Sequence, residues 1–406
     1  MSGDSPLDIA IVGGGIVGLS TAFTLAQRYS GLGIAVFEKE ADIAQHQTGH
    51  NSGVIHSGIY YRPGSLRARM AVKASQRMMD FCAEHGIPYD RCGKVIVATA
   101  GSQVPALEEL LRRGEANGVP GVRMIGPEEL KALEPYATGI RALHVPSAGI
   151  VNYSLVAGMY RKLLERAGGQ VRTGAEVSAI VAEPNALRLE TTLGEVRSKH
   201  VITCGGLYAD RVSIAAGLKP QVKVAAFRGE YSELVPEKRY LVRNLIYPVS
   251  NPAFPFLGVH FTRRISGAIE VGPNAVLAFK RQGYRWRDVS VGDTLDILGY
   301  VGFWRMAARY WRTGLGEVYR SLYKQAMVRE LQKLVPDVTG RDLVRAGAGV
   351  RAQALDRQGN LVDDFHIVQE SRMIHVLNAP SPAATASLSI GSAVADMAGQ
   401  WLDPKS

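Results

Sequence analysis

A glycine-rich turn near the N-terminus constrains the fold of this chain more than any other feature of its sequence. The segment Asp8–Val12, which is apolar after its first residue, predicts a buried parallel strand, and it leads directly into Gly13-Gly-Gly-Ile-Val-Gly18, a GxGxxG pattern. Apolar and small residues then recur at helical spacing from Leu19. The glycines therefore lie at a strand-to-helix turn, which is typical of a nucleotide-binding βαβ unit.

Each conspicuous residue of this unit has its own physical task. Gly13 permits the tight turn, Gly15 lets the backbone approach a pyrophosphate, and Gly18 lets the helix pack closely on the sheet. The unpaired N–H groups at the start of the helix favour a phosphate. Glu38 ends the second expected strand, Ile34–Phe37, where its carboxylate would accept hydrogen bonds from a ribose. The sequence thus predicts a dinucleotide site, although the fingerprint alone does not separate FAD from NAD.

Later segments favour FAD. Gln47–Gly58 is rich in glycine and short polar residues, which suits a backbone that lies along an extended ligand, and Val201–Gly206 predicts another strand that ends in glycines. The chain closes with an expected strand, Met373–Leu377, and a small-residue helix from about 385 to 401. A nucleotide fold completed by the last helix is typical of an enclosed flavin. The residues expected to contact FAD are Gly13, Gly15, Gly18, Glu38, Lys39, Thr48, Asn51, Ser52, Gly53, Val177, Gly205, Gly206, Pro380, Ala383, Ala384 and Thr385.

The order of these segments indicates two interleaved domains, since 406 residues exceed one ordinary domain. We expect an α/β, Rossmann-like FAD-binding domain from residues 1–80, 148–215 and 340–406. An α+β substrate domain would come from residues 81–147 and 216–339. Ligand sites favour such junctions, so the active site would lie between the two domains.

Several strings of the sequence also carry a family resemblance. They are the Gly13–Gly18 fingerprint with Glu38, the string His46–Tyr61, the segments Phe256–Thr262 and Val271–Lys280, and the closing Asn378–Thr385. Together they resemble the L-2-hydroxyglutarate dehydrogenases (oxidases), which belong to the glycine oxidase and D-amino acid oxidase class of FAD proteins. The resemblance implies oxidation of an L-2-hydroxy dicarboxylate to 2-oxoglutarate, with hydride passing to the flavin N5.

Such a reaction requires a base for the hydroxyl proton, and histidine is suited to that task near neutral pH. His56 lies among small residues, and His260 lies in an apolar strand-like run. Each would be a structural, hydrogen-bonded histidine in the alternative interpretation. With the resemblance we expect both to take part in catalysis or substrate contact, with His260 as the base because it comes from the substrate domain. His46 and His50 would then touch the flavin, and a covalent histidyl link stays open.

The two carboxylates of the substrate require cationic or amide donors, and arginine offers a planar fork that matches a carboxylate. Arg351 follows the glycine-rich run Ala346–Val350, which would bring its side chain near the flavin. Asn274, Lys280 and Tyr61 are further substrate-binding candidates, with a structural role as the alternative for each. No metal site is expected.

Most of the positive charge is concentrated in one segment. The chain has 47 Lys and Arg against 37 Asp and Glu, a formal charge of +10. Residues 280–329 contribute ten basic and four acidic side chains and three of the four tryptophans. Such a charge favours an anionic substrate, an anionic membrane surface or nucleic acid.

Within this segment the spacing predicts one basic amphipathic helix. Its apolar face would hold Ile297, Val301, Trp304, Ala308 and Trp311, and its basic face Arg305, Arg309 and Arg312. Such a helix can lie in a membrane interface, although packing on its own domain is the alternative. We expect Trp304, Trp311, Arg305, Arg309 and Arg312 to face the membrane. Electrons would then pass to membrane quinone.

Other functions stay open at this stage. One is an amino acid oxidase of the same FAD class, and another is a flavoprotein that binds RNA or acts as a scaffold. Nucleic acid is not expected as a partner, because no recognition motif accompanies the basic segment. The sequence contains no window of 18 uninterrupted apolar residues and no basic leader. We therefore expect a peripheral protein on the cytoplasmic side of the inner membrane.

Overall fold

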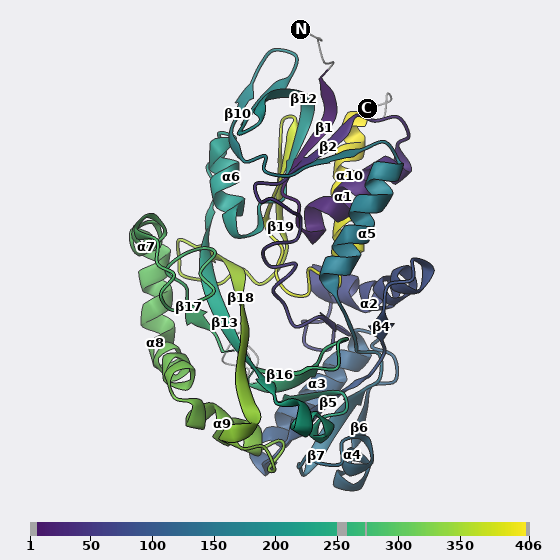
Figure 1. The fold of residues 1–406 in the computed structure, drawn as a ribbon, viewed down its shortest axis with the longest axis vertical. Coiled ribbons are helices and arrows are strands. Elements are labelled where there is room, and N and C mark those ends of the chain that lie inside the picture. Colours follow the sequence, from purple (N-terminus) through teal and green to yellow (C-terminus); the bar gives the residue numbers. More distant parts are fainter. Residues whose placement is uncertain (1–5, 250–257, 273, 403–406) are drawn as a thin grey trace.

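The structure is a computed structural model that describes residues 6–249, 258–272 and 274–402. Figure 1 shows two parts connected by a pair of long strands, β13 (Val222–Leu234) and β18 (Leu343–Asp356). One part contains the N-terminal βαβ unit together with the last helix. The other part contains a second sheet and most of the middle of the chain.

The first sheet is built around the N-terminal strand. Its strands in the described residues are β1 (Leu7–Val12), β2 (Ile34–Phe37), β9 (Gln170–Arg172), β10 (Val177–Ala182), β11 (Leu187–Thr191), β12 (Gly194–Thr203), β19 (His366–Glu370) and β20 (Met373–Asn378). They follow the order β10-β11-β12-β1-β2-β9, with β20 beside β12 and β19 beside β20. β1 pairs in parallel with both β2 and β12. The carboxyl ends of these three strands therefore meet at one edge of the sheet.

Helices cover both faces of this sheet, which explains why β1 is apolar throughout. Ile9 and Ile11 pack in one core cluster with helices on one face, and the alternate residues Ala10 and Val12 pack in another cluster on the opposite face. The helices around the sheet are α1 (Ile16–Arg28), α5 (Tyr153–Arg166), α6 (Ala209–Ala215) and α10 (Ser387–Leu402). Figure 1 shows α1, α5 and α10 gathered beside β1 and β2. This is the α/β, Rossmann-like arrangement that the glycine turn predicts.

The second sheet carries the expected substrate side. Its strands in the described residues are β5 (Lys94–Ala98), β6 (Arg123–Ile125), β7 (Arg141–Val145), β13, β14 (Leu245–Pro248), β15 (His260–Arg263), β16 (Ile269–Gly272), β17 (Val276–Leu277) and β18. Their order is β17-β13-β16-β15-β14-β5-β7-β6, with β18 beside β13. Val95 and Val97 pack with α9 (Lys324–Gln332) on one face, whereas Ile96 and Tyr247 pack with α3 (Val104–Ala116) on the other. Alternate residues of each strand therefore point to different surroundings.

The remaining elements lie around these two sheets. They are the small sheet of β3 (Val54–Ile55), β4 (Tyr89–Asp90) and β8 (Gly149–Val151), and the helices α2 (Leu66–Glu84), α4 (Pro127–Leu133), α7 (Val291–Leu298) and α8 (Val301–Leu322). β3 pairs with β8, and β8 pairs with β4. The small sheet thereby ties the segment that follows the glycine turn to the entrance of α5.

One domain boundary differs from the sequence-based expectation. β18 pairs antiparallel with β13 over almost its whole length, from Leu343 opposite Leu234 to Asp356 opposite Val222. Residues 343–356 therefore belong to the second sheet, although the expected FAD-binding segment was 340–406. The physical reason is that an alternating strand pattern identifies a strand but not its pairing partner.

The basic segment forms two helices where the sequence predicts one. α7 ends at Leu298, Gly299 caps it, and Tyr300 has an extended backbone that precedes α8. Ile297 packs in a buried cluster with Phe303 and Met306. Ile297 therefore does not share a face with Val301, and the assignment of these two residues to one apolar helix face was wrong.

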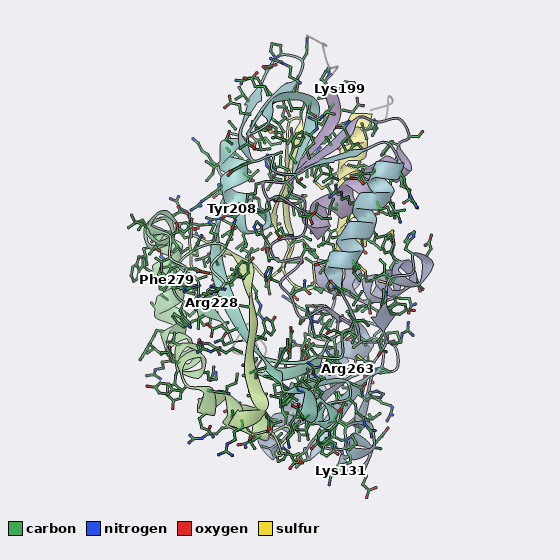
Figure 2. The ribbon with its side chains drawn as sticks, viewed as in Figure 1. Lys131, Lys199, Tyr208, Arg228, Arg263 and Phe279 are labelled. Carbon is green, nitrogen blue, oxygen red and sulfur yellow. The ribbon has the colours of Figure 1, made fainter. Side chains whose placement is uncertain are left out.

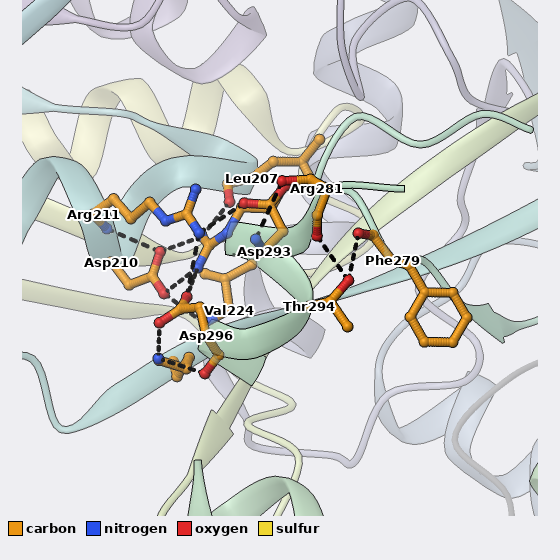
Figure 3. Close-up of polar contacts among 11 residues, drawn as sticks. Leu207, Asp210, Arg211, Val224, Phe279, Arg281, Asp293, Thr294 and Asp296 are labelled. Carbon is orange, nitrogen blue, oxygen red and sulfur yellow. Dashed lines mark hydrogen bonds and ion pairs between the residues drawn. The ribbon is translucent and has the colours of Figure 1, made fainter. Parts of the chain in front are cut away.

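A buried ion-pair network attaches this segment to the nucleotide side of the molecule. The guanidinium of Arg281, which is 4% exposed, binds both carboxylate oxygens of Asp210, at the start of α6, and the carbonyl oxygen of Leu207. Asp296 of α7 completes the network by accepting from Arg281 and from Lys223 of β13 (Figure 3). Charged groups this deeply buried require such partners. The network therefore fixes α7 against α6 and β13.

Candidate active site

The glycine turn is built by contacts that leave no room for side chains. Gly13 has φ of +116°, and a Cβ there would overlap the carbonyl oxygen of Cys204, which follows β12. A Cβ at Gly18 would overlap the carbonyl oxygen of Gly13. At Gly15, by contrast, a Cβ would meet only the Thr48 hydroxyl, at 3.5 Å. The turn is therefore closed at Gly13 and Gly18 by other protein atoms and open at Gly15, where a ligand can approach the protein backbone.

The start of α1 provides an anion site. Gly15 is the N-cap residue and has no side chain to cap the helix, while the hydroxyl of Thr48 accepts the N–H of Ile16 at 3.0 Å. Glu38 is buried at the end of β2, and one of its carboxylate oxygens accepts the N–H of Gly14 at 2.7 Å. Helix N-termini favour phosphate, and a carboxylate at this position suits ribose hydroxyls. These residues fit the pyrophosphate and ribose of FAD.

The loop after β2 owes its shape to its own side chains. The Asn51 amide donates to the carbonyl oxygens of Gln47 and Thr48 and accepts from the N–H of Gly53. Asn51 thus holds the loop, and the half-buried Ser52 lies within it. At the start of this loop, the Lys39 ammonium pairs with Glu40 and lies 4.7 Å from the ring centre of Tyr208.

The last helix meets the same loop. The Thr385 hydroxyl accepts the N–H of His56 at 3.2 Å and lies 2.8 Å from the Tyr153 hydroxyl. The turn before α10 is closed by a hydrogen bond from the Ala383 N–H to the Pro380 carbonyl oxygen, and the Ala384 carbonyl oxygen accepts from Ser387. The structure thus brings the 47–56 loop and the turn before α10 together.

The two remaining groups of expected cofactor residues belong to the first sheet and the turn that follows one of its strands. Gly205 and Gly206 come after Cys204, which follows β12, and a Cβ at Gly206 would lie 3.3 Å from the Gln47 side chain of the loop. Val177 begins β10, where it is buried opposite Thr191. Gly205 and Gly206 therefore lie near the glycine turn, whereas Val177 belongs to the outer part of the sheet.

On the second sheet, His260 and Arg351 lie in a buried polar cluster. His260, the first residue of β15, is 4% exposed, and its ring stacks on the Tyr247 ring of β14 with 3.9 Å between centroids. Arg351 of β18 donates a hydrogen bond to the hydroxyl of Tyr231 of β13 and acts electrostatically on both His260 and Tyr247. Residues that are far apart in the sequence thus form one site.

The tautomer of His260 follows from its partner. Its Nδ1 lies 2.7 Å from the carbonyl oxygen of Gly258, and a carbonyl only accepts, so Nδ1 carries the hydrogen. The lone pair of the neutral ring is then on Nε2. Burial, together with the positive charges of Arg351 and Lys94, lowers the pKa of His260 to about 3 against the opposing effect of the Gly258 hydrogen bond. The ring is therefore neutral and has a proton-accepting nitrogen.

Other expected substrate residues have different surroundings. The Asn274 amide is used by Glu230, accepting its backbone N–H at 2.8 Å and donating to its carboxylate at 3.1 Å. Lys280 is exposed in a turn, outside the buried cluster. Tyr61 is buried beside α2, where its carbonyl oxygen accepts from Asn117. His56 contributes its backbone N–H to Thr385. These geometries favour structural roles for Asn274 and Tyr61.

Sequence reasoning missed several residues of the cluster. Lys94, at the start of β5, is 1% exposed and lies 4.9 Å from the Tyr247 ring centre. Tyr231 and Tyr247 contact Arg351 and His260 as described above. The guanidinium of Arg264 binds the carbonyl oxygen of Asn51 and so joins the second sheet to the 47–56 loop. A lysine that begins an otherwise apolar strand was the only trace of these residues in the sequence.

A cavity of about 950 Å³ adjoins the cluster, and Tyr231 belongs to its lining. His50 also lines it, with its ring stacked on Tyr284 at 4.3 Å between centroids. The basic side chains of the lining are Arg285, Arg287, Arg320, Lys324 and Arg345, and its acidic ones are Glu230 and Asp288. Because the positive charges are in excess, the cavity attracts anions. Within the described part of the chain, no group of three or more His, Cys, Asp or Glu side chains is arranged to hold a metal ion.

Comparison with known proteins agrees with this arrangement. The family model described as DAO, FAD dependent oxidoreductase, matches residues 8–397. The chain is 49% identical over 391 residues to the L-2-hydroxyglutarate dehydrogenase of Indibacter alkaliphilus, covering 96% of this chain and 98% of that protein. It belongs to the family of L-2-hydroxyglutarate dehydrogenases.

Further relatives of this family span distant organisms. The mitochondrial L-2-hydroxyglutarate dehydrogenase of Homo sapiens is 47% identical over 97% of this chain and 88% of its own length. The L-2-hydroxyglutarate dehydrogenase of Escherichia coli K12 is 46% identical over 95% of this chain and 91% of its own length. The family resemblance drawn from the sequence is thereby confirmed.

Solved structures confirm the fold. L-alpha-glycerophosphate oxidase from Mycoplasma pneumoniae, with FAD bound, is similar with a TM-score of 0.78 and 22% identity, covering 96% of this chain and 93% of that one. Glycine oxidase from Geobacillus kaustophilus has a TM-score of 0.73 and 20% identity, covering 97% and 95%. With the family model that matches residues 8–397, the chain is an FAD-dependent oxidoreductase, as its sequence predicted.

Proposed function

We propose that the protein oxidises L-2-hydroxyglutarate to 2-oxoglutarate in an FAD-dependent reaction. The names of its relatives, at 46–49% identity over almost the whole chain, support this substrate. When bound, FAD supplies the acceptor for the hydride from C2 of the substrate. The residues around the glycine turn hold its pyrophosphate and ribose, and the cluster on the second sheet supplies the remaining chemistry.

The observation that carries the proposal is the hydrogen bond between His260 and Gly258. Because Nδ1 donates to that carbonyl oxygen, Nε2 has the lone pair that takes the proton of the substrate hydroxyl. As the C2–H bond breaks and hydride leaves, the oxygen keeps the electron pair of the O–H bond and forms the carbonyl of 2-oxoglutarate. His260 is then the proton acceptor, and stacking on Tyr247 holds its ring in orientation.

Charge complementarity explains why an acid is the substrate. Arg351 lies in the same cluster and would bind the carboxylate next to the reacting hydroxyl. In the protein alone, Arg351 and Lys94 lower the pKa of His260. The negative charges of a bound dicarboxylate oppose this effect, so the pKa of His260 rises when substrate binds and the ring becomes a stronger base.

Anaerobic titration of the purified protein tests the proposal directly. L-2-hydroxyglutarate should bleach the oxidised flavin and yield one equivalent of 2-oxoglutarate per flavin. Glycine and D-alanine should leave the spectrum unchanged; bleaching by either of them instead would favour an amino acid oxidase. Salt-sensitive RNA retention without turnover of any hydroxy acid would favour the binding-protein alternative.

We also propose that α8 rests on an anionic membrane surface. Its side chains Val301, Trp304, Trp311, Leu315 and Leu322 are each at least 46% exposed and recur at intervals of three, four and seven residues. They form an apolar row, called here the α8 row, on the side of the helix away from the buried Phe303 and Met306. Figure 1 shows α8 along the outer edge of the molecule. Within the described residues, no helix has the length and hydropathy of a membrane span.

Basic side chains flank the α8 row. Arg305 donates to the Arg357 carbonyl oxygen and Arg309 to the Asn360 side chain, and both remain exposed. Arg312 lies over the Trp311 ring, 5.3 Å from its centre. An exposed apolar row beside cationic side chains suits the headgroup region of an anionic bilayer. A peripheral position of this kind would let reduced flavin pass its electrons to membrane quinone.

Vesicle flotation separates the contribution of the α8 row from that of the basic side chains. The protein should float with vesicles that contain anionic lipid, and Trp304→Ser with Trp311→Ser should abolish flotation. Neutralising Arg305, Arg309 and Arg312 to Gln should remove the preference for anionic lipid. Equal flotation of all variants would contradict the proposed membrane contact, and α8 would then be an ordinary protein surface. Reoxidation of reduced protein by a soluble quinone, compared with oxygen, tests the acceptor.

A further inference from the structure

Lys94 is a buried cation to which neither the fold nor the proposed proton transfer assigns a task. It begins β5, is 1% exposed, and ranks among the largest side chains that are fully buried. Lysine is almost never buried without a partner, because an ammonium ion loses its hydration there. Figure 2 shows how densely side chains fill the second sheet, where this strand lies. Its position therefore requires an explanation.

The surroundings of Lys94 offer contact but no neutralising charge. Its Nζ lies 4.7 Å from the ring centre of Tyr60 and 4.9 Å from that of Tyr247. Among the residues that the structure describes, no carboxylate lies within ion-pairing distance of this ammonium, and burial alone lowers the pKa of Lys94 to about 7. Aromatic faces attract a cation without cancelling its charge. The protein thus presents Lys94 without a counter-ion.

A second donor lies beside it. The Tyr60 hydroxyl is buried and, within the described residues, has no hydrogen-bond partner. Unsatisfied buried donors are rare in folded proteins, and each requires an explanation, such as a functional role or a bound partner. A carboxylate satisfies both donors at once, since its oxygens accept the ammonium N–H and the phenol O–H.

The position of this pair relative to His260 indicates what it binds. Tyr247 contacts both the proposed base and the lysine: its ring stacks on His260 and lies next to the Lys94 ammonium. The charge of Lys94 also reaches His260, as does that of Arg351. Two separate cations therefore stand near one base, on β5 and β18. Such an arrangement matches a substrate that has a carboxylate at each end.

We propose that Lys94, together with the Tyr60 hydroxyl, binds the second carboxylate of the substrate and makes the enzyme select 2-hydroxy dicarboxylic acids over 2-hydroxy monocarboxylic acids. The inference rests on the proposed oxidation of L-2-hydroxyglutarate and goes beyond it. Arg351 takes the carboxylate next to the hydroxyl, and Lys94 takes the distal one. Lys94 is a specificity residue and leaves the proton transfer to His260.

The test compares two ligands that differ only at the distal end. 2-Oxoglutarate and 2-oxopentanoate are titrated against the FAD-loaded protein, and binding is read from the perturbed flavin spectrum. Lys94→Met should weaken the binding of 2-oxoglutarate about 100-fold and change the binding of 2-oxopentanoate by no more than about two-fold. Tyr60→Phe should weaken the binding of 2-oxoglutarate about ten-fold. Lys131→Met, on the exposed face of α4, is the matched control and should change neither.

The same comparison applies to turnover, with the corresponding 2-hydroxy acids as substrates. For Lys94→Met, kcat/KM should fall about 100-fold with L-2-hydroxyglutarate, mainly through KM, and stay nearly constant with L-2-hydroxypentanoate. Unchanged discrimination in a variant that unfolds cooperatively, at or above the melting temperature of the wild type, and keeps its flavin would overturn the inference. Equal loss with both substrates would also overturn it, because Lys94 would then act in the chemical step. Wild-type protein that neither binds 2-oxoglutarate nor is bleached by L-2-hydroxyglutarate would instead refute the proposed function.

Discussion

The imidazole of His260 stacks on the phenol ring of Tyr247, with 3.9 Å between the ring centroids and 24° between their planes. β15 and β14 pair side by side, so the stack connects two strands of the second sheet. Together with the hydrogen bond to Gly258, it leaves the His260 ring a single orientation and a defined tautomer. The proposed base is therefore positioned by the protein before substrate arrives.

This geometry predicts the effect of removing the ring. His260→Ala should slow flavin reduction by L-2-hydroxyglutarate about 10³-fold, since a positioned general base contributes about 10²- to 10⁴-fold. FAD content should be unchanged, because His260 lies on the second sheet and not at the glycine turn. Stopped-flow absorbance of the flavin measures the rate. Rapid bleaching of His260→Ala would remove His260 from the role of base.

Lys94 predicts a pH dependence of stability. Burial lowers the pKa of Lys94 from 10.5 to about 7 in the folded protein, whereas the unfolded chain keeps the ordinary value. Below pH 7 both states carry the proton, and the folded state bears the full cost of the buried charge. As pH rises from about 7 to 10, the folded state loses its proton first and this cost declines.

Lys94→Met should therefore melt at a higher temperature than the wild type without ligand. The difference in unfolding free energy should be largest below pH 7, with an upper bound of about 5 kcal/mol from the pKa shift, and should shrink toward pH 10. Thermal unfolding of both proteins across this pH range measures it. Lys131→Met again serves as control, and a difference that does not change with pH would contradict the assignment.

The same group predicts the pH profile of the reaction. The groups that face Lys94 are Tyr60, Tyr247 and His260, and only Lys94 changes charge near neutral pH. With L-2-hydroxyglutarate, kcat/KM should fall as pH rises through about 7, because the ammonium that receives the distal carboxylate is lost. The alkaline decline should be absent in Lys94→Met, and its persistence there would assign it to another group.

Local features could be predicted from the sequence, whereas long-range pairings could not. The glycine turn and Glu38 follow from residues within one βαβ unit, so their spacing alone defines them. Lys94 contacts Tyr60, in a turn earlier in the chain, and Tyr247 of β14, and no periodicity in β5 indicates these contacts. Likewise, the interruption at Gly299 separates two helices that share one helical pattern.

The Arg281 network predicts that loss of the Asp210 carboxylate strongly destabilises the protein. Asp210→Asn leaves Arg281 buried without its main partner and should cost about 3 to 5 kcal/mol of unfolding free energy. Arg281→Met removes the positively charged guanidinium itself, and Asp210 then keeps its hydrogen bond from the Val224 N–H. Urea unfolding measures both variants, with Arg112→Met on the exposed face of α3 as control. Values below about 1 kcal/mol for Asp210→Asn would show that the network contributes little.

The glycine turn predicts that two neighbouring substitutions fail for different reasons. At Gly18 a Cβ overlaps the Gly13 carbonyl oxygen, so Gly18→Ala should prevent close packing of α1 on the sheet and yield unstable protein. At Gly15 a Cβ meets only the Thr48 hydroxyl, at 3.5 Å, so Gly15→Ala should fold with a wild-type circular dichroism spectrum. The added methyl group then stands where the pyrophosphate approaches, and FAD should be lost on gel filtration. Gly15→Ala protein that retains a full complement of FAD would place the pyrophosphate elsewhere.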